Sequence, residues 1–325
     1  MLSMKIFYGL VLVIVSQFMK ADLLIIEECT RIDNFDETIL SKLSKVVVPE
    51  LNGKRKGEAG KIAVVGGSKE YTGAPYFAAI SALKVGADLV YVITTENAAP
   101  VIKSYSPDLI VIPHTSTNIS AYLLPSVHTV VIGPGLGRST EGLNLAYEVI
   151  KICKKMQKPL VIDADGLYAI YKDVQILKDY PSPGAILTPN NAEVKRLKQS
   201  VPETDTPWYK YWGDHVTVLQ KGEQDMYFSN TGEFDWSISE GGSGRRAGGQ
   251  GDILAGALGT FYNWGLNANI CETNKSTQLA QSVAAYAAAK FTRTCNSKAY
   301  KIYGRSMIAS NMLNEIHSAF DDLFL

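Results

Sequence analysis

Short, continuous apolar runs alternate with longer Ala-rich stretches along most of the chain, and Gly-rich turns separate the two. Continuous apolar runs are typical of strands that are buried on both faces of a mainly parallel sheet. The predicted strands are 61–65, 89–94, 109–112, 129–132, 160–163, 185–187 and 216–220. The longer stretches at 76–85, 255–264 and 279–292 are typical of core-facing helices. The pattern therefore predicts an α/β fold.

Other segments flank this alternating pattern. An amphipathic stretch at 39–48 and a basic linker at 54–56 precede the first strand, and an Asn-Thr-Gly turn within 227–233 predicts a late hairpin. No domain linker and no internal repeat interrupts residues 60–320. We therefore expect a single domain from 38 to 325.

An apolar run at 6–15 precedes the predicted domain. It has the length of the hydrophobic part of a signal peptide and is too short to span a bilayer comfortably. Residues 1–21 are therefore a candidate targeting segment, although the cleavage site is weak and Met19 offers a later start. Sequons at Asn118 and Asn274 matter only in the secretory pathway. We expect no stable membrane span and a cytoplasmic catalytic body, with the endoplasmic reticulum as the alternative.

Composition narrows the classes of ligand. Lys plus Arg and Asp plus Glu each number 32, so the chain lacks the net positive field that would favour nucleic acid as a partner. The cysteines Cys29, Cys153, Cys271 and Cys295 have no C-x-x-C spacing for a metal or redox pair, and they suit a reducing compartment. A small anionic ligand would therefore need a local cradle in the fold.

Two glycine turns follow predicted strands and are candidates for such a cradle. The turn at 66–68 opens a helix, but it matches neither a Walker motif nor a dinucleotide fingerprint, and a tight turn without a ligand explains it equally well. The turn at 133–138 has glycines at 133, 135 and 137, which would let a ligand approach the backbone closely. The second turn is the stronger candidate.

The sharpest pattern is the glycine-rich segment 241–252, which ends in Gly-Gly-Gln-Gly-Asp and leads into a predicted helix. A helix N-terminus directs free N–H groups and the positive end of its dipole at an anion. Asp252 would lie in the first turn, and the neighbouring Arg245 and Arg246 suit phosphate oxygens. A simple N-cap is the alternative role of Asp252, but a cap does not require five glycines upstream. The segment therefore predicts an anion site with a carboxylate beside it.

The Gly-Gly-Gln-Gly-Asp motif at 248–252 resembles the anion hole and catalytic Asp of the ribokinase-like superfamily. Further motifs narrow the resemblance to the ATP-dependent NAD(P)H-hydrate dehydratases, in which they occur in the same order. They are Val-Ile-Gly-Pro-Gly-Leu-Gly-Arg at 131–138, Val-Ile-Asp-Ala-Asp-Gly-Leu at 161–167, Leu-Thr-Pro-Asn-Asn-Ala-Glu-Val-Lys-Arg-Leu at 187–197 and Gln-Lys-Gly at 220–222. The resemblance covers most of the chain, from residue 40 to residue 320.

The resemblance implies a three-layer α/β/α ribokinase-like fold with a central, mainly parallel sheet. It also implies a lyase that dehydrates the S epimer of hydrated NADH or NADPH back to the reduced cofactor while ATP is cleaved to ADP and phosphate. ATP is then a co-substrate that acts with Mg²⁺, and no residue is assigned as a ligand of the metal. The expected partners are these small molecules, and association into a homo-oligomer is a further expectation.

Carried over position by position, the resemblance implies two groups of binding residues. Those for the hydrated nicotinamide nucleotide are Gly135, Gly137, Asn190, Asn191, Ala192, Glu193, Val194, Lys195, Arg196 and Asp252. Those for ATP are Lys221, Gly222, Glu223, Gln224, Asp225, Gly242, Ser243, Gly244, Arg245, Arg246, Ala247, Gly248, Gly249, Gln250 and Gly251. For Asn190, Asn191 and Glu193, a helix cap after Pro189 is an equally good explanation.

Asp252 is the implied catalytic residue. It would accept the proton of the substrate's ring hydroxyl as that oxygen attacks the γ-phosphorus of ATP. We expect its carboxylate to be exposed, with an ordinary pKa of about 4. Asp163 and Asp165, at a predicted strand end, either order a turn or hold Mg²⁺-bound water.

Two departures from the family pattern concern the shape of the pocket. Ala247 stands where a Cys is common, and Val194 stands where an aromatic residue is common. A ribokinase-like kinase acting on a hydroxymethylpyrimidine, a thiazole alcohol or a sugar is the alternative function. Such a kinase would release a stable phosphate ester, whereas the dehydratase would release free phosphate.

Overall fold

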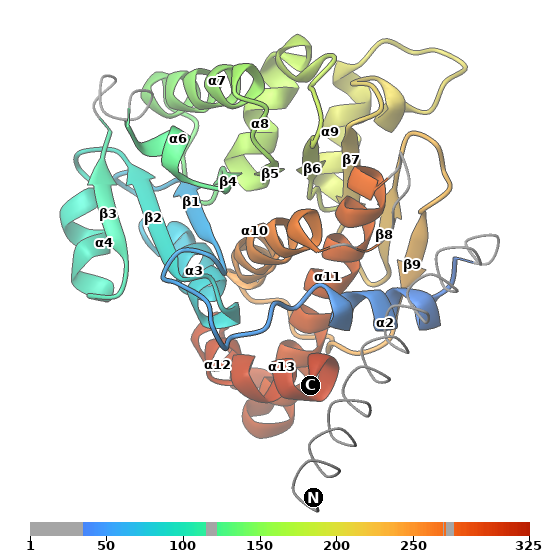
Figure 1. Ribbon diagram of the computed structural model, residues 1–325. Coiled ribbons are helices and arrows are strands. Elements are labelled where there is room, and N and C mark those ends of the chain that lie inside the picture. Colours follow the sequence, from blue (N-terminus) through green and yellow to red (C-terminus); the bar gives the residue numbers. More distant parts are fainter. Residues whose placement is uncertain (1–34, 115–121, 269, 271–275) are drawn as a thin grey trace, which may run out of the picture.

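The computed structural model describes residues 35–114, 122–268, 270 and 276–325, and a single sheet runs through this part of the chain (Figure 1). Its nine strands lie in the order β3-β2-β1-β4-β5-β6-β7-β8-β9. They are β1 (Lys61–Val65), β2 (Leu89–Thr94), β3 (Ile110–Pro113), β4 (Thr129–Ile132), β5 (Leu160–Ile162), β6 (Ala185–Leu187), β7 (Val216–Gln220), β8 (Asp225–Phe228) and β9 (Trp236–Ile238). Neighbouring strands from β3 to β7 are parallel, and β8 and β9 add an antiparallel edge.

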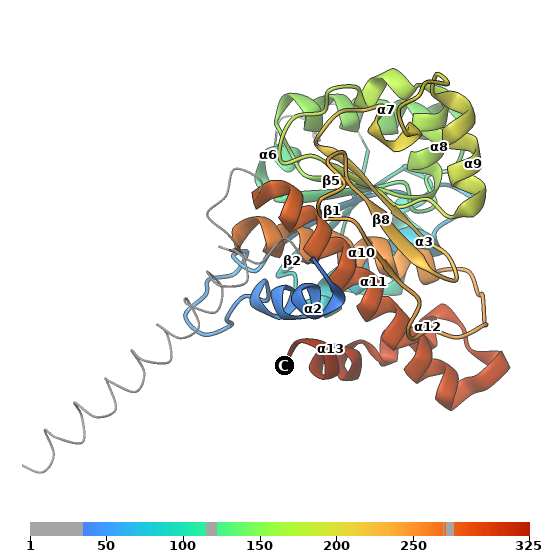
Figure 2. The ribbon, with the colours of Figure 1, turned by 90° about the vertical axis from the view of Figure 1, so that its right-hand side faces the viewer.

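The helices form a layer on each face of the sheet. The α-helices are α2 (Glu37–Val46), α3 (Gly73–Val85), α4 (Ala99–Tyr105), α6 (Leu124–Ser126), α7 (Thr140–Lys155), α8 (Ala164–Lys172), α9 (Asn191–Ser200), α10 (Gln250–Asn267), α11 (Ser276–Tyr303), α12 (Ala309–Asn314) and α13 (Ile316–Phe324). In Figures 1 and 2, α7, α8 and α9 cover one face, while α3, α10 and α11 cover the other. Helices α2, α12 and α13 lie outside α11. The predicted three-layer α/β/α fold is therefore confirmed.

Alternate strand residues supply two separate cores. Ile62 and Val64 of β1 belong to the core beneath α3, α10 and α11, whereas Ala63 and Val65 belong to the core beneath α7 and α8. Successive side chains of a strand point to opposite faces, so a strand covered on both sides is mostly apolar along its whole length. The continuous apolar runs of the sequence follow from this requirement.

Most of the predicted strand limits agree with the structure. The predicted bounds of β1, β2, β4, β6 and β7 match, whereas β3 lies one residue later than expected. Strand β5 ends at Ile162, because Asp163 adopts extended backbone angles as the residue that precedes α8. The predicted hairpin is present, but 227–233 covers only the end of β8 and the turn that leads to β9.

Two core helices are longer than the sequence pattern predicted. The apolar stretch predicted for α10 began at 255, but the helix begins at Gln250, where the glycine-rich motif predicted its first turn, and α11 continues to Tyr303 rather than ending at 292. The first turn of α10 includes Gly251 and Asp252, two residues of low helix propensity. Packing on the sheet therefore outweighs local propensity at the point where the candidate site begins.

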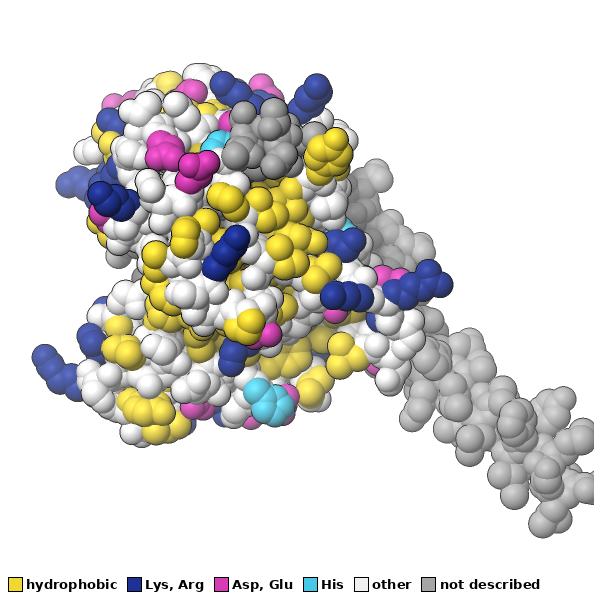
Figure 3. All heavy atoms as spheres, turned by 90° about the vertical axis from the view of Figure 1, so that its left-hand side faces the viewer, with side chains coloured by type: hydrophobic (Ala, Val, Ile, Leu, Met, Phe, Trp, Pro, Cys, Tyr) yellow, Lys and Arg dark blue, Asp and Glu magenta, His cyan; other side chains and the backbone are white. Residues whose placement is uncertain are grey.

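Within the described residues, the sheet has two edge strands, β3 and β9. Strand β3 forms one edge, and α4 lies beside it. The face of the molecule on this side carries a concentration of hydrophobic side chains (Figure 3). Val101 and Tyr105 of α4 and Ile110 of β3 are among the exposed large hydrophobic residues.

The predictions for the N-terminus and for the two sequons fall on residues 1–34, Asn118 and Asn274, which lie outside the described residues. Cys29 and Cys271 lie outside them too, whereas Cys153 and Cys295 are buried, unpaired thiols. Burial raises the pKa of Cys153 to about 12, so this thiol is unreactive at neutral pH. Within the part of the chain that the structure describes, no helix has the length and hydrophobicity needed to cross a membrane.

The contact between α10 and α3 yields a first prediction. A Cβ added at Gly256 would lie 1.9 Å from the carbonyl oxygen of Ala78, and backbone cannot move aside cheaply. We expect Gly256→Ala to lower the free energy of unfolding by about 1–3 kcal/mol, although Ala normally favours a helix by about 1 kcal/mol. Denaturant titration measures the change.

Gly248→Ala is the matched control for this substitution, because a Cβ at Gly248 meets no atom within 4 Å. It should leave the unfolding midpoint nearly unchanged. A Gly256→Ala protein as stable as the parent would show that α10 and α3 do not approach as closely as the structure indicates.

Candidate functional site

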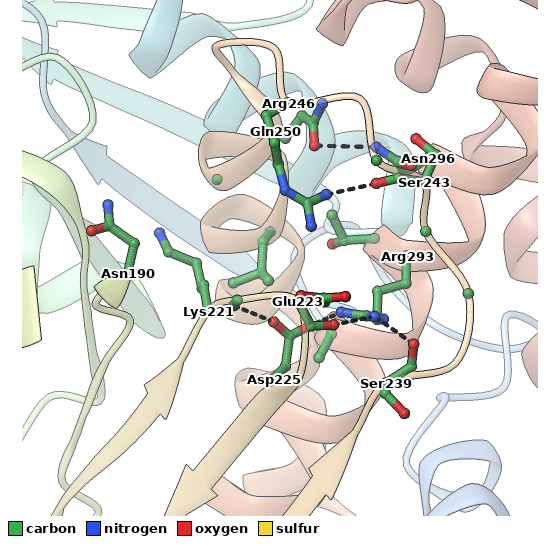
Figure 4. Close-up of a pocket in the computed structure, with 18 of the residues that line it drawn as sticks. Asn190, Lys221, Glu223, Asp225, Ser239, Ser243, Arg246, Gln250, Arg293 and Asn296 are labelled. Atoms are coloured by element: carbon green, nitrogen blue, oxygen red, sulfur yellow. Dashed lines mark hydrogen bonds and ion pairs between the residues drawn. The ribbon is translucent and has the colours of Figure 1, made fainter. Parts of the chain in front are cut away.

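A cleft of about 960 Å³ opens beside the first turn of α10 (Figure 4). It lies between the N-terminus of α9, the loop that follows β7, the glycine-rich segment and one side of α11. The lining residues are Asn190, Asn191, Ala192, Lys221, Gly222, Glu223, Asp225, Ser239, Gly241, Gly242, Ser243, Gly244, Arg246, Ala247, Gln250, Gly251, Leu254, Ala289, Thr292, Arg293 and Asn296. The cleft therefore meets the carboxyl ends of the strands, where open α/β sheets bind ligands.

The N-terminus of α10 has no side-chain cap. Gly249 precedes the helix with φ of 92°, a left-handed conformation that glycine adopts readily. Asp252 lies in the first turn, so the alternative in which Asp252 is only the N-cap is wrong. The first N–H groups of α10 have no side-chain acceptor and remain available to an anion.

The carboxyl group of Asp252 is perturbed by its surroundings. Burial raises its pKa most, the negative charges of Asp163 and Asp165 raise it further, and Lys221 lowers it, with a net value of about 7. The side chain is half-buried rather than exposed. The expectation of an exposed carboxylate with an ordinary pKa was therefore wrong, because it left out the burial of this side chain and the acidic residues that the fold brings to this point.

Lys221 lies at the end of β7 and makes a buried ion pair. Its Nζ is 2.5 Å from Oδ1 of Asp163, a side chain that is only 2% exposed. The hydroxyl of Thr188 donates to the same oxygen over 2.9 Å. Burial lowers the pKa of Lys221, but the charges of Asp163, Glu193 and Asp252 together outweigh it and raise the pKa above its usual value. Lys221 is therefore a permanent cation beside α10.

Asn190 caps α9 and also lines the cleft. Its Oδ1 accepts from the N–H groups of Ala192 and Glu193, and the Glu193 carboxylate accepts from the N–H of Asn190, which completes a capping box. Asn191 accepts a bond from the side chain of Gln220. The capping explanation is correct for Asn190 and Glu193, and it does not remove Asn190, Asn191 or Ala192 from the cleft.

The later residues of α9 are less uniform. Glu193 and Arg196 line a small hollow between α8 and α9, together with Tyr168. Val194 is 6% exposed, and Lys195 faces solvent. Neither Val194 nor Lys195 lines the cleft or the hollow. Helical periodicity explains the difference, because consecutive residues of a helix face different directions.

The Gly135–Gly137 turn lies outside the cleft, near Asp252. Gly135 and Gly137 have φ of 62° and 77°, which favours glycine at both positions. Asp165 accepts from the N–H of Gly137 over 2.9 Å and pairs with Arg138 over 3.2 Å. Asp165 therefore orders this turn, and its charge also acts on Asp252.

The residues predicted for ATP divide into two sets. Most of them line the cleft, but Gln224, Arg245, Gly248 and Gly249 do not. The guanidinium of Arg246 donates to the carbonyl of Ser243, and that of Arg245 donates to the carbonyl of Arg246. The two arginines therefore brace their own loop in this structure.

Asp225 lines the cleft, but its carboxylate is already occupied. One oxygen accepts from the N–H of Gly222 over 2.9 Å, and the other accepts from Arg293 over 3.0 Å. Both side chains of the ion pair are largely buried. The geometry gives Asp225 a structural task within the wall of the cleft.

Sequence reasoning missed Arg293 of α11. Besides Asp225, its guanidinium donates to the carbonyls of Glu223, Ser239 and Glu240, so one side chain joins the loop after β7 to the segment after β9 (Figure 4). Nothing around residue 293 resembles a ligand motif, and only the fold brings it to the cleft. Ala289, Thr292 and Asn296 of α11 were missed for the same reason.

Comparisons with known proteins match nearly the whole chain. The model of the NAD(P)H-hydrate dehydratase family matches residues 62–317. The ATP-dependent (S)-NAD(P)H-hydrate dehydratase of Aedes aegypti is 49% identical over 290 residues, which cover 88% of this chain and 85% of the relative. The human protein of the same name is 42% identical over 301 residues, which cover 89% and 85% of the two chains.

Solved structures share the fold. A hypothetical protein of Streptococcus mutans aligns with a TM-score of 0.72 at 20% identity, covering 88% of this chain and 99% of its own. The ADP/ATP-dependent NAD(P)H-hydrate dehydratase of Bacillus subtilis, co-crystallised with ATP/Mg²⁺, aligns with a TM-score of 0.64 at 18% identity. It covers 87% of this chain and 97% of its own. At these identities the likeness shows a common fold.

The Arg293–Asp225 pair yields a second prediction. Arg293→Gln leaves the carboxylate of Asp225 buried without its cation, which should lower the free energy of unfolding by about 3 kcal/mol. Asp225→Asn in the same chain removes the orphaned charge. The double variant should therefore lose less stability than the two single losses added together, as measured by denaturant titration. Purely additive losses would show that the two side chains do not interact.

Proposed function

This chain belongs to the NAD(P)H-hydrate dehydratase family, and from that premise we propose that it dehydrates the S epimer of hydrated NADH or NADPH at the expense of ATP. The observation that carries the proposal is the first turn of α10, where free N–H groups, the Lys221 cation and the Asp252 carboxylate lie together. Phosphoryl transfer needs this combination, because it requires a base for the attacking hydroxyl and positive charge around the phosphoryl group.

We propose that ATP occupies the cleft and that the hydrated nucleotide approaches Asp252 from the side of the Gly135–Gly137 turn. Glycines at 242, 244 and 251 line the cleft and allow phosphate oxygens to approach the backbone. Gly135 and Gly137 are themselves buried, and Asp165 holds their turn through the N–H of Gly137, so we propose that the hydrated nucleotide lies against the outside of this turn. The two substrates would then meet at the start of α10.

Mg²⁺ fits this arrangement as a companion of ATP. No group of three or more His, Cys, Asp or Glu side chains that could hold a metal ion occurs within the described ranges. Magnesium in nucleotide sites commonly takes one or two carboxylates together with phosphate oxygens and water. Glu223 lines the cleft and would supply such a carboxylate. The ion would neutralise charge on the phosphates when ATP is bound.

In the proposed reaction, the ring hydroxyl oxygen of the substrate bonds to the γ-phosphorus and ADP leaves with the electrons of the broken bond. Asp252 takes the hydroxyl proton, and the N–H groups of α10 stabilise the negative oxygens of the transferred group. The phosphate ester then departs as free phosphate, pushed out by the lone pair of the ring nitrogen. Loss of a proton from the neighbouring ring carbon restores the reduced nicotinamide.

We propose that residues 38–325 act as one catalytic domain, that this domain works in the cytoplasm, and that copies of the chain associate. The single sheet shared by all described strands supports the first. The buried thiols of Cys153 and Cys295 are compatible with a reducing compartment.

The third prediction tests the function and the base together. Purified protein given hydrated NADH and Mg·ATP should release free phosphate and regain the absorbance of reduced nicotinamide. Asp252→Asn should keep the fold and ATP binding but lower turnover by about 10²-fold or more, because a positioned base is lost. Asp205→Asn, at an exposed position, is the control. A stable phosphorylated product would instead identify a kinase, and normal turnover by Asp252→Asn would remove the assigned role.

The fourth prediction concerns pH. A base must be deprotonated to act, so a pKa of about 7 at Asp252 makes the rate rise with pH through neutrality. Activity at limiting substrate should be about tenfold lower at pH 6 than at pH 8, as expected for a single group that titrates at pH 7. The rate is measured after confirming that the protein stays folded at both values. A profile that is flat between these values would mean that Asp252 titrates as an ordinary carboxylate.

A further inference from the structure

We propose that Asp163 is a positioning residue, which holds the ammonium of Lys221 inside the anion hole at the start of α10 and away from Asp252. The proposal rests on the proposed function, because it assigns a task in the same phosphoryl transfer. It concerns a residue for which the resemblance gives no binding or catalytic role.

Three neighbouring strands build this arrangement. Asp163 follows β5, Thr188 follows β6 and Lys221 follows β7, so each side chain starts from the carboxyl end of its own strand. Lys221 and Thr188 both donate to Oδ1 of Asp163, over 2.5 Å and 2.9 Å. Asp163 is buried, so its carboxylate cannot turn away into solvent. The position of the ammonium is therefore fixed by the sheet.

The ammonium lies directly on the first turn of α10. A Cβ at Gly251 would be 3.1 Å from Nζ of Lys221 and 3.7 Å from Oδ2 of Asp163. Glycine thus allows the cation to lie against the helical backbone, among the N–H groups that face the cleft. An ammonium has three donors, and within the described structure only Asp163 accepts from it. The remaining donors are available to a phosphoryl group.

Asp163 also determines which carboxylate forms an ion pair with Lys221. Glu193 and Asp252 are the other carboxylates whose charges act on this ammonium. Without Asp163, the nearest alternatives for the cation are those two groups. An ion pair with Asp252 would occupy the oxygen that must accept the hydroxyl proton. Asp163 therefore keeps the base free while it keeps the cation where the phosphoryl group passes.

Stability alone is a weak reason for this pair. Replacing a buried ion pair by apolar residues is often neutral or stabilising, because removing two charges from water is costly. A pair with only a structural role would also lie wholly within the core, whereas Lys221 lines the cleft (Figure 4). The pair lies where its charge can act on a ligand.

The first test compares Asp163→Asn with Asp165→Asn. Both substitutions remove a carboxylate whose charge acts on Asp252, but Asp165 binds Gly137 and Arg138 instead of Lys221. We expect Asp163→Asn to lower kcat about 10-fold to 10²-fold with KM for the hydrated dinucleotide little changed. Asp165→Asn should mainly raise that KM, because it loosens the Gly135–Gly137 turn. Unchanged kcat in Asp163→Asn would overturn the proposal.

A double-mutant cycle shows whether Asp163 acts through Lys221. Lys221→Met should lower kcat, and adding Asp163→Asn to it should cause no further loss, because the residue that Asp163 positions is already gone. Independent losses that multiply would show that Asp163 acts in another way and would overturn the proposal. Denaturant titration of each variant confirms that folded protein is compared.

A binding measurement separates this proposal from the proposed function. ADP with Mg²⁺ and tetrafluoroaluminate imitates a phosphoryl group in transfer, and calorimetry measures its affinity without any turnover. Asp163→Asn should lower the affinity for this mixture about 10-fold or more while leaving the affinity for ADP alone nearly unchanged. Equal affinity in parent and variant would sink the role of Asp163 even if the dehydratase activity is found. A parent protein without dehydratase activity would refute the proposed function and leave this binding result standing.

Discussion

The close packing of α10 on the sheet and against the neighbouring α3 is the constraint on which the site depends. A Cβ at Gly256 would overlap the backbone of Ala78, and one at Gly259 would lie 2.7 Å from the side chain of Val131. These glycines let the helix lie deep against both neighbours. Because α10 cannot shift, its first turn stays at the carboxyl ends of β5, β6 and β7. The anion hole is thus positioned by apolar packing several residues away from it.

Two buried ion pairs, Arg293–Asp225 and Lys221–Asp163, lie around the cleft. Burying either charge without its partner would cost free energy of folding. Arg293 and Asp225 fix the loops that form one wall. Lys221 and Asp163 meet at the start of α10, where the charges of Asp165 and Asp252 also converge. In the first pair the Arg293 guanidinium uses four of its five N–H donors, one on Asp225 and three on carbonyl groups. In the second pair the Lys221 ammonium uses one of its three donors, on Asp163, so most of its hydrogen-bonding capacity remains for a ligand.

The sequence predicts whatever is encoded locally. Continuous apolar runs located β1, β2, β4, β6 and β7, and the Gly-Gly-Gln-Gly-Asp motif located the first turn of α10. What it could not predict depends on residues that are distant in sequence. The pKa of Asp252 is raised first by its burial in the fold and then by the charges of Asp163 and Asp165, and Arg293 reaches the cleft only because α11 packs against α10. The sequence also did not predict which way the side chains of α9 point. The motif was assigned to the ligand site as a whole, but Val194 and Lys195 face away from the cleft.

Asn190 shows why a structural role and a ligand-binding role need not compete. The helix cap uses only the amide oxygen of the side chain, which accepts from two N–H groups. The amide nitrogen takes no part in the cap, and Asn190 stands at the edge of the cleft beside Lys221 (Figure 4). A cap also fixes the rotamer of the side chain, so its nitrogen is already oriented before any ligand arrives. Capping therefore reduces the conformational entropy that such a residue would lose on binding. A capping residue at the mouth of a cleft is thus well suited to contact a ligand.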